Sequence, residues 1–161
     1  MYANSLENDG DDSVQGVATE MRLQLESLLR KGGVDIALWG HHHSYQRTCP
    51  VYNFTCVGDE DIEDDKGGDG GDGGEGGDEQ DGPIHIIIGM AGYSLTTEIE
   101  TPPPSWSVYV DVTEHGYTRY TANYTHMHFE YVANKGKTVK DSFVLQKSNP
   151  YARKKIVKSM H

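Results

Sequence analysis

The stretch that decides the fold is VDIALWGHHHSYQRTCPVY, residues 34–52. Its first seven residues are largely apolar and end in a glycine, which is typical of a strand buried on both faces of a sheet. Before it, apolar residues recur at helical spacing and predict an amphipathic helix over 14–31: Val14, Val17, Ala18, Met21, Leu25 and Leu28. Gly32-Gly33 can end this helix. A helix, a glycine turn and a buried strand form an α/β unit.

Further strands are predicted after residue 82. PIHIIIGMAG (83–92) reads as a second buried strand that ends in glycines, and residues 105–112 alternate between apolar and polar positions. Residues 117–123, 125–132 and 138–146 continue as strands, with a hairpin turn at 134–137. The chain therefore ends in an antiparallel β meander. We expect the basic tail, SNPYARKKIVKSMH (148–161), to be frayed.

The charge is concentrated in one segment. The chain has 161 residues, about one domain, and a net charge of −11. Residues 58–82 hold twelve of the 25 acidic residues and one of the 14 basic ones, which leaves thirteen of each elsewhere. Repulsion and glycine content predict a disordered surface insert. An acidic cation buffer is the alternative, which would lose calcium binding when 58–82 is deleted. No basic surface suggests nucleic acid.

The cysteines and sequons bear on the cellular compartment. Cys49 and Cys56 can close a small disulfide loop if the chain turns back, and two buried thiols are the alternative. Asn53 and Asn123 each begin an N-glycosylation sequon. These features favour a secreted or extracellular parent protein. The chain has no run of about 18 apolar residues, so no membrane span is expected, and no signal peptide is recognisable.

The three consecutive histidines are the candidate metal site. In extended backbone, side chains i and i+2 point the same way, so His41 and His43 can converge while His42 points away. Ligands of open α/β sheets lie beyond the carboxyl ends of strands, which is where this cluster falls. A second H-x-H pattern, His126-Met127-His128, is interpreted as the polar face of a strand. His85 and His115 are interpreted as structural or surface residues.

Two histidines are only part of a hydrolytic centre. A catalytic zinc usually has about three protein ligands, and a two-metal site needs more. The candidate carboxylates Asp35, Asp111 and Asp141 lie in or beside predicted strands, away from a strand-to-glycine turn. We therefore assign no catalytic residue to this chain.

Several segments resemble plant-type purple acid phosphatases. LWGHHHSYQRTCPVYNFTC (38–56) is similar to the G-H-x-H segment of that family, usually LWGHVHxYERTCPVY. PIHIIIGMAG is similar to the family's V-H-V-V-I-G-M-A-G strand, and residues 115–147 are similar to its C-terminal region. The helix and strand before the histidines also match. The likeness covers about residues 14–147, apart from the acidic insert and stretches beside it.

The resemblance implies a fold and an activity. The fold is α/β, the C-terminal portion of a metallophosphoesterase α/β sandwich. The family is a group of acid phosphatases (phosphoric monoester hydrolases) with a dinuclear centre of Fe³⁺ with Zn²⁺, Mn²⁺ or Fe²⁺. By this resemblance, His41 and His43 bind metal, one to each ion, and His42 occupies a variable position. The partner is a phosphate monoester, with no nucleic acid or membrane, and the oligomeric state stays open.

The departures from the family pattern are large. The motifs G-D-x-G, G-D-x-x-Y and G-N-H-E are absent, Met1-Tyr2 look like the end of G-H-R-P-M-Y, and Gln46 stands where glutamate is usual. We expect a C-terminal fragment with an incomplete metal centre, inactive alone. The alternative is a non-catalytic module that binds metal weakly or pairs with a partner. The predicted divisions are 1–57 with the histidines, 58–82 the insert, 83–147 the C-terminal region and 148–161 the tail.

Overall fold

A computed structural model describes residues 1–4, 13–57, 82–96, 98–147 and 155–160. In chain order their elements are α1 (Ser13–Lys31), β1 (Ile36–Trp39), β2 (Tyr45–Tyr52), β3 (Thr55–Cys56), β4 (Ile84–Ile88), β5 (Ser107–Asp111), β6 (Gly116–Ala122), β7 (His126–Ala133), β8 (Val139–Gln146) and β9 (Lys155–Met160). Apart from Gly82, the predicted insert lies outside the described residues, as do 148–154 and 161 of the predicted tail.

The first sheet is mixed, with strand order β1-β4-β2-β3, and β5 pairs with β2. β1 and β4 are parallel, with Ile36 opposite Ile84, although the acidic insert separates them in sequence. β2 is antiparallel to β4 and places Tyr45 opposite Ile88. The two apolar runs that end in glycine are therefore neighbouring strands whose carboxyl ends meet at one edge of the sheet.

The two predicted buried strands differ in their surroundings. In β4, Ile84, Ile86 and Ile87 are all buried. In β1, Leu38 is 49% exposed, because β1 has no partner beyond β4 among the described residues. The prediction of a strand buried on both faces is thus right for β4 and wrong for β1, which lies at the edge.

The second sheet is the antiparallel meander β6-β7-β8-β9, of which β6, β7 and β8 were predicted. Residues 107–111, which were also expected in the meander, instead form β5 of the mixed sheet. Gly136 and Lys137 have positive φ angles of 73° and 54° in the turn between β7 and β8. The prediction of a frayed tail is wrong for residues 155–160, which form β9 against β8. The outer edge of β8 supplies hydrogen-bond partners, and Ile156 packs against the main core.

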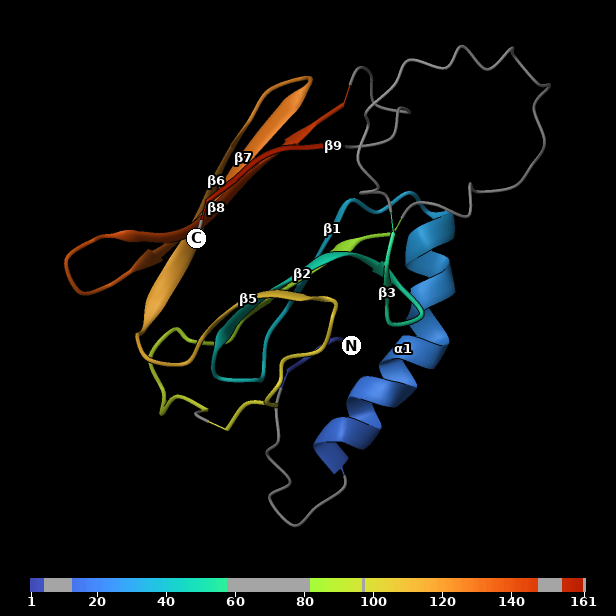
Figure 1. The fold of residues 1–161 in the computed structure, drawn as a ribbon, viewed down its shortest axis with the longest axis horizontal. Coiled ribbons are helices and arrows are strands. Elements are labelled where there is room, and N and C mark those ends of the chain that lie inside the picture. The colour runs from blue at the N-terminus through green and yellow to red at the C-terminus, as the bar shows by residue number, and fades with distance from the viewer. Residues whose placement is uncertain (5–12, 58–81, 97, 148–154, 161) are drawn as a thin grey trace.

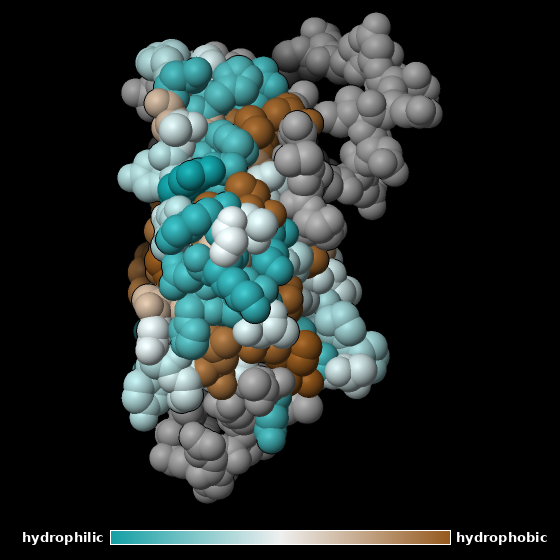
Figure 2. Space-filling model, turned by 90° about the vertical axis from the view of Figure 1, so that its left-hand side faces the viewer, coloured by the Kyte–Doolittle hydropathy of each residue, from teal (hydrophilic) through white to brown (hydrophobic). Residues whose placement is uncertain are grey.

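The two sheets pack face to face, and α1 lies on the other side of the mixed sheet (Figure 1). The core between the sheets takes residues from both: Tyr45, Ile84, Ile86, Met90, Phe129, Tyr131, Phe143 and Leu145. Figure 2 views the molecule from the meander side, where hydrophilic residues dominate the centre and hydrophobic patches are small. One face of the meander therefore faces solvent, as is common for antiparallel sheets.

The helix uses an unexpected face. Val17 and Leu28, two positions of the predicted apolar face, are 57% and 62% exposed, whereas Glu26 is buried. The hydroxyl of Tyr2 donates to the Glu26 carboxylate, and the guanidinium of Arg22 lies over the Phe54 ring. The predicted apolar face is therefore only partly buried: Ala18, Met21 and Leu25 are half-buried, and the helix also buries Glu26 against Tyr2. No helix among the described residues is long and apolar enough to cross a membrane.

A buried ion pair joins the two sheets. Arg47 on β2 donates to both carboxylate oxygens of Asp141 on β8, at 2.7 and 2.8 Å. The hydroxyl of Tyr45 donates to the same carboxylate at 2.8 Å. Tyr45 and Arg47 are two residues apart and share the face of β2 that points to the meander, whereas Gln46 lies on the opposite face. Asp141, one of the candidate carboxylate ligands in the sequence, therefore has a structural role: it binds Arg47 and Tyr45.

Candidate functional site

The histidines form a tight turn between β1 and β2, which we call the histidine turn (residues 40–44). The amide of His42 donates to the Gly40 carbonyl at 3.0 Å, and the amide of Ser44 donates to the His42 carbonyl at 2.9 Å. His41 has a φ of 75°. A left-handed backbone at a residue other than glycine is uncommon and costs energy, and such residues cluster at functional sites.

The three imidazoles have different environments. His41 is exposed, His42 is 9% exposed, and His43 is half-buried with its ring edge-to-face on Tyr93, 5.1 Å between centroids. Burial, with the neighbouring imidazoles of His43 and His41, lowers the pKa of His42 to about 4. His42 is thus neutral at pH 7 and turned into the protein, while the other two rings are accessible to solvent.

Close packing holds the histidine turn in place. A Cβ added to Gly89, just after β4, would lie 1.9 Å from the His42 carbonyl oxygen. Only glycine lets the two backbones approach this closely. The amide of Thr96 also donates to the His43 carbonyl at 3.0 Å. The PIHIIIGMAG segment (83–92) therefore packs directly against the histidine turn. The glycines of this segment were visible in the sequence, but nothing in the sequence indicated that Gly89 contacts His42.

The two exposed imidazoles fit a metal only as part of a ligand set. No group of three or more His, Cys, Asp or Glu residues suited to a metal forms within the described ranges. Asp35 instead pairs with Lys147 at 2.9 Å, and Asp111 accepts from Thr113. The histidine turn therefore offers two ligands, His41 and His43, and the remaining ligands of a metal centre have to come from other residues.

The other histidines lie apart from one another. The Trp39 indole donates to Nδ1 of His85, whose burial lowers its pKa to about 3. His126 contacts the Thr125 hydroxyl at the start of β7, and His128 is half-buried on the same strand. His115 reaches the Tyr93 carbonyl at 2.6 Å and so supports the loop that touches His43.

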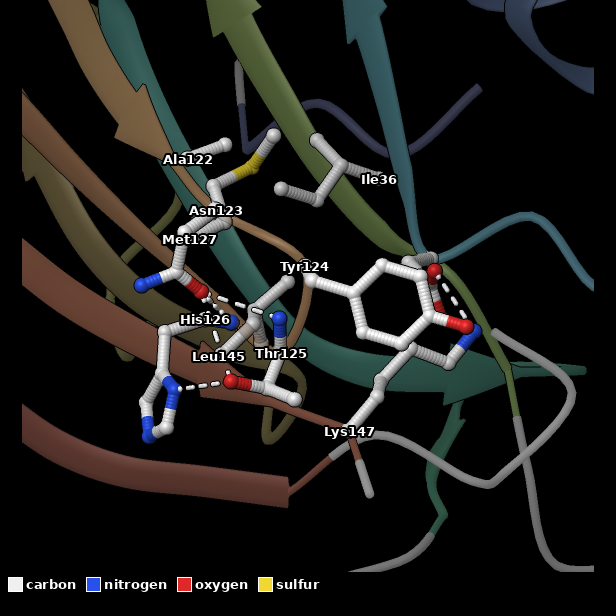
Figure 3. Close-up of a pocket in the computed structure, with 10 residues that line it drawn as sticks. Ile36, Ala122, Asn123, Tyr124, Thr125, His126, Met127, Leu145 and Lys147 are labelled. Atoms are coloured by element: carbon white, nitrogen blue, oxygen red, sulfur yellow. Dashed lines mark hydrogen bonds and ion pairs between the residues drawn. The ribbon is translucent and has the colours of Figure 1, made fainter. Parts of the chain in front are cut away.

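The cysteines and sequons occupy two hairpin regions. Cys49 on β2 and Cys56 on β3 form a disulfide. Asn53, in the turn between these strands, is exposed. Asn123, between β6 and β7, is also exposed, and its side-chain oxygen accepts from the amides of Thr125 and His126. Its amide nitrogen points away from the adjacent cavity (Figure 3).

That cavity lies far from the histidine turn. It has a volume of about 360 Å³ and lies between the start of β1 and the meander, lined in part by Ile36, Tyr124, Met127 and Leu145. Tyr124 and Lys147 both line it (Figure 3), and Lys147 pairs with Asp35. Ile36 begins β1, whereas the histidines follow its end. The cavity is therefore separate from the candidate metal site.

The mixed sheet packed on an antiparallel meander is matched by proteins of the purple acid phosphatase family. Residues 82–142 match the family model described as iron/zinc purple acid phosphatase-like protein C. The chain is 39% identical to mouse acid phosphatase type 7, over 76% of this chain and 26% of that protein. It is 35% identical to the Arabidopsis thaliana protein named probable inactive purple acid phosphatase 1, over 78% and 18% of the two chains.

A solved structure agrees. The purple acid phosphatase isolated from yellow lupin (Lupinus luteus) seeds matches with a TM-score of 0.58 and 32% identity, over 74% of this chain and 19% of that one. The predicted resemblance is confirmed: this chain belongs to the purple acid phosphatase family and matches its C-terminal part. It spans about a quarter or less of the length of these three relatives.

Proposed function

We propose that His41 and His43 are two ligands of the dinuclear centre of a purple acid phosphatase that hydrolyses phosphate monoesters. The metals in this proposal are Fe³⁺ with Zn²⁺, Mn²⁺ or Fe²⁺. The observation that carries it is the histidine turn, where His41 has a left-handed backbone and is exposed, and His43 is half-buried against Tyr93. The resemblance of residues 38–56 to the family's G-H-x-H segment supports the same residues.

The chain's own contribution to the chemistry is positional. A bound dinuclear centre supplies Lewis-acid stabilisation of the charge on phosphoryl oxygens. His41 and His43 each offer one imidazole nitrogen, while His42 turns inward and does not compete for metal. Gly89 and Thr96 hold the backbone of the turn, so the two rings start from a restricted geometry. Such preorganisation lowers the entropic cost of binding.

Zinc binding tests the ligand assignment. In the full chain, Zn²⁺ should shift the imidazole NMR signals of His41 and His43 and leave His126 and His128 unchanged. The matched control is the H126A variant, which should bind zinc as the unaltered chain does, whereas H41A and H43A should each weaken binding at least tenfold. Equal zinc responses from all four histidines would count against the proposal.

The chain alone should not hydrolyse phosphate esters. Two imidazoles cannot hold and polarise two metals, because a two-metal site needs more ligands. With added iron and zinc, p-nitrophenyl phosphate should turn over no faster than with the H41A/H43A double variant. Metal-dependent turnover that disappears in that double variant would contradict the expectation.

The second candidate function is a non-catalytic module that pairs with another protein strand. It is favoured by the edge of β1, with which no other described strand than β4 pairs and where Leu38 is 49% exposed, and by the exposed Leu28 of α1. Unpaired edge strands are ready templates for association. Sedimentation of the chain should then show concentration-dependent association that L38K weakens. A monomer at all concentrations would remove this candidate.

We also propose that the parent protein is secreted and glycosylated at Asn53 and Asn123, since both side chains are exposed and one disulfide is present. When the chain is expressed behind a secretory leader in eukaryotic cells, glycosidase treatment should lower its apparent mass in two steps. N53Q and N123Q should each remove one step. An unchanged mass after treatment would refute the modification.

A further inference from the structure

A chain of buried polar groups links the first residues of the protein to the histidine turn. It consists of Asn4, Gln46, Ser44 and His42, which are 1%, 3%, 0% and 9% exposed. Buried polar groups are costly unless they are hydrogen-bonded, so the direction of each bond in such a chain is constrained. These hydrogen-bonded groups lie on the side of β2 opposite Arg47, away from the meander.

The side-chain amide of Gln46 forms hydrogen bonds through both its oxygen and its nitrogen. Its oxygen accepts from the Asn4 amide at 2.7 Å, and its nitrogen donates to the Asn4 carbonyl at 3.2 Å. The same nitrogen donates to the Ser44 hydroxyl at 2.9 Å. Both N–H groups and the oxygen are thus engaged. A carboxylate could accept from Asn4 but could donate to neither partner, because an ionised carboxylate has no hydrogen to give.

The direction of these bonds determines the state of His42. The Ser44 hydroxyl contacts only Gln46 and Nδ1 of His42 (2.9 Å) among side chains in the described part of the molecule. Because Gln46 donates to it, the geometry directs the serine hydrogen to Nδ1 of His42. In that arrangement the hydrogen of the neutral His42 ring is on Nε2, a buried atom that has no hydrogen-bond partner among the described residues. The tautomer of a neutral histidine is set by such partners.

We infer that Gln46 is a positioning residue that orders the histidine turn through Ser44 and His42. His42 and Ser44 flank His43, so fixing both fixes the backbone on each side of a proposed ligand. Asn4 in turn accepts from the Glu100 amide at 2.9 Å, which connects the loop after β4 to the same chain of bonds. The link to metal binding rests on the proposed function, whereas the effect on His42 does not.

The decisive variant is Q46E. Its carboxylate accepts from the Ser44 hydroxyl, which can then no longer donate to His42, so His42 must donate from Nδ1 instead. Long-range ¹H–¹⁵N NMR of the full chain at pH 7 should show Nε2–H in the unaltered protein and Nδ1–H in Q46E. Hydrogen exchange of the Ser44 and Thr96 amides, which bond to the carbonyls of His42 and His43, should rise at least tenfold.

Two further variants keep the experiment interpretable. Q146E makes the same chemical change on β8, and it should leave the His42 tautomer and both exchange rates unchanged. Q46L removes the amide without adding charge, so it leaves the direction of the Ser44–His42 bond unconstrained and should raise exchange at Asn4 and Thr96. If Q46E does not fold, the amide exchange rates of Q46L at Asn4 and Thr96 alone test the role of Gln46.

The outcomes separate this inference from the proposed function. Retention of Nε2–H in folded Q46E, or unchanged exchange at Ser44 and Thr96 in the variants, overturns the role of Gln46. Zinc titration of the same samples should show about tenfold weaker binding in Q46E, as expected when a supporting partner of a ligand is lost. If zinc fails to shift His41 and His43 in the unaltered chain, the proposed function fails, while the NMR result still judges Gln46.

Discussion

Replacing Asp141 with asparagine should lower the free energy of unfolding by about 3–5 kcal/mol. Arg47 and Asp141 are 2% and 0% exposed at their side chains, so the substitution leaves a guanidinium buried without its counter-charge. Removing one partner of a buried pair is far more costly than the pair's net contribution, because the remaining charge stays desolvated. Urea unfolding of the full chain, followed by circular dichroism, measures the change.

The control is an ion pair on the surface of the meander. Nε of Arg119 lies 2.6 Å from Oε2 of Glu130, but the Arg119 side chain is 55% exposed. E130Q removes the same kind of charge and should have little effect, since solvent screens such pairs. If D141N is too unstable to study, Y45F, which removes one bond to Asp141, should cost about 1.5–3 kcal/mol. Equal small losses in D141N and E130Q would show that the pair does not hold the sheets together.

Replacing Gly89 with alanine should destabilise the chain by about 1–3 kcal/mol and displace the histidine turn. The new Cβ would lie 1.9 Å from the oxygen and 2.7 Å from the carbon of the His42 carbonyl, so backbone must move. Hydrogen exchange at Ser44 should accelerate, and the imidazole signals of His41 and His43 should shift. These measurements report on the turn itself, whereas urea unfolding reports on the whole chain.

Gly92 provides the comparison three residues later. A Cβ there would meet nothing within 4 Å, so G92A should leave both stability and the histidine signals nearly unchanged. If G89A behaves like G92A, the close approach does not constrain the turn. A loss of stability without any change at His41 and His43 would mean that β4, and not the turn, absorbs the strain.

The local sequence pattern was sufficient to predict most of the helix and strand segments. The apolar runs ending in Gly40 and Gly89 predicted β1 and β4, and the alternation over 105–112 predicted β5, because strand formation follows side-chain periodicity. The strands β6, β7 and β8 of the meander were also predicted. The family resemblance, carried by the motifs around the histidines, was also readable and is confirmed. The pairing of Cys49 with Cys56 was left open by the sequence and is a disulfide in the structure.

Neighbours in space decided what local pattern could not. The apolar stripe of α1 predicted its buried face, yet Val17 and Leu28 are exposed and Glu26 is buried, because Tyr2 meets the helix there. β1 looked like a central strand, but its position at the edge depends on which strands pair with it. β9 formed from a tail expected to fray, because β8 offered an open edge.

The sequence by itself indicated the family, the strands β1, β4, β5, β6, β7 and β8 in their order along the chain, and the pair of histidines that follows β1. Those properties depend on residue type and spacing along the chain. Only the tertiary structure decided that Asp141 neutralises Arg47, that Gly89 supports the histidine turn and that Gln46 connects it to Asn4. Each of these is a contact between distant segments, and its energy depends on burial and on the direction of individual hydrogen bonds.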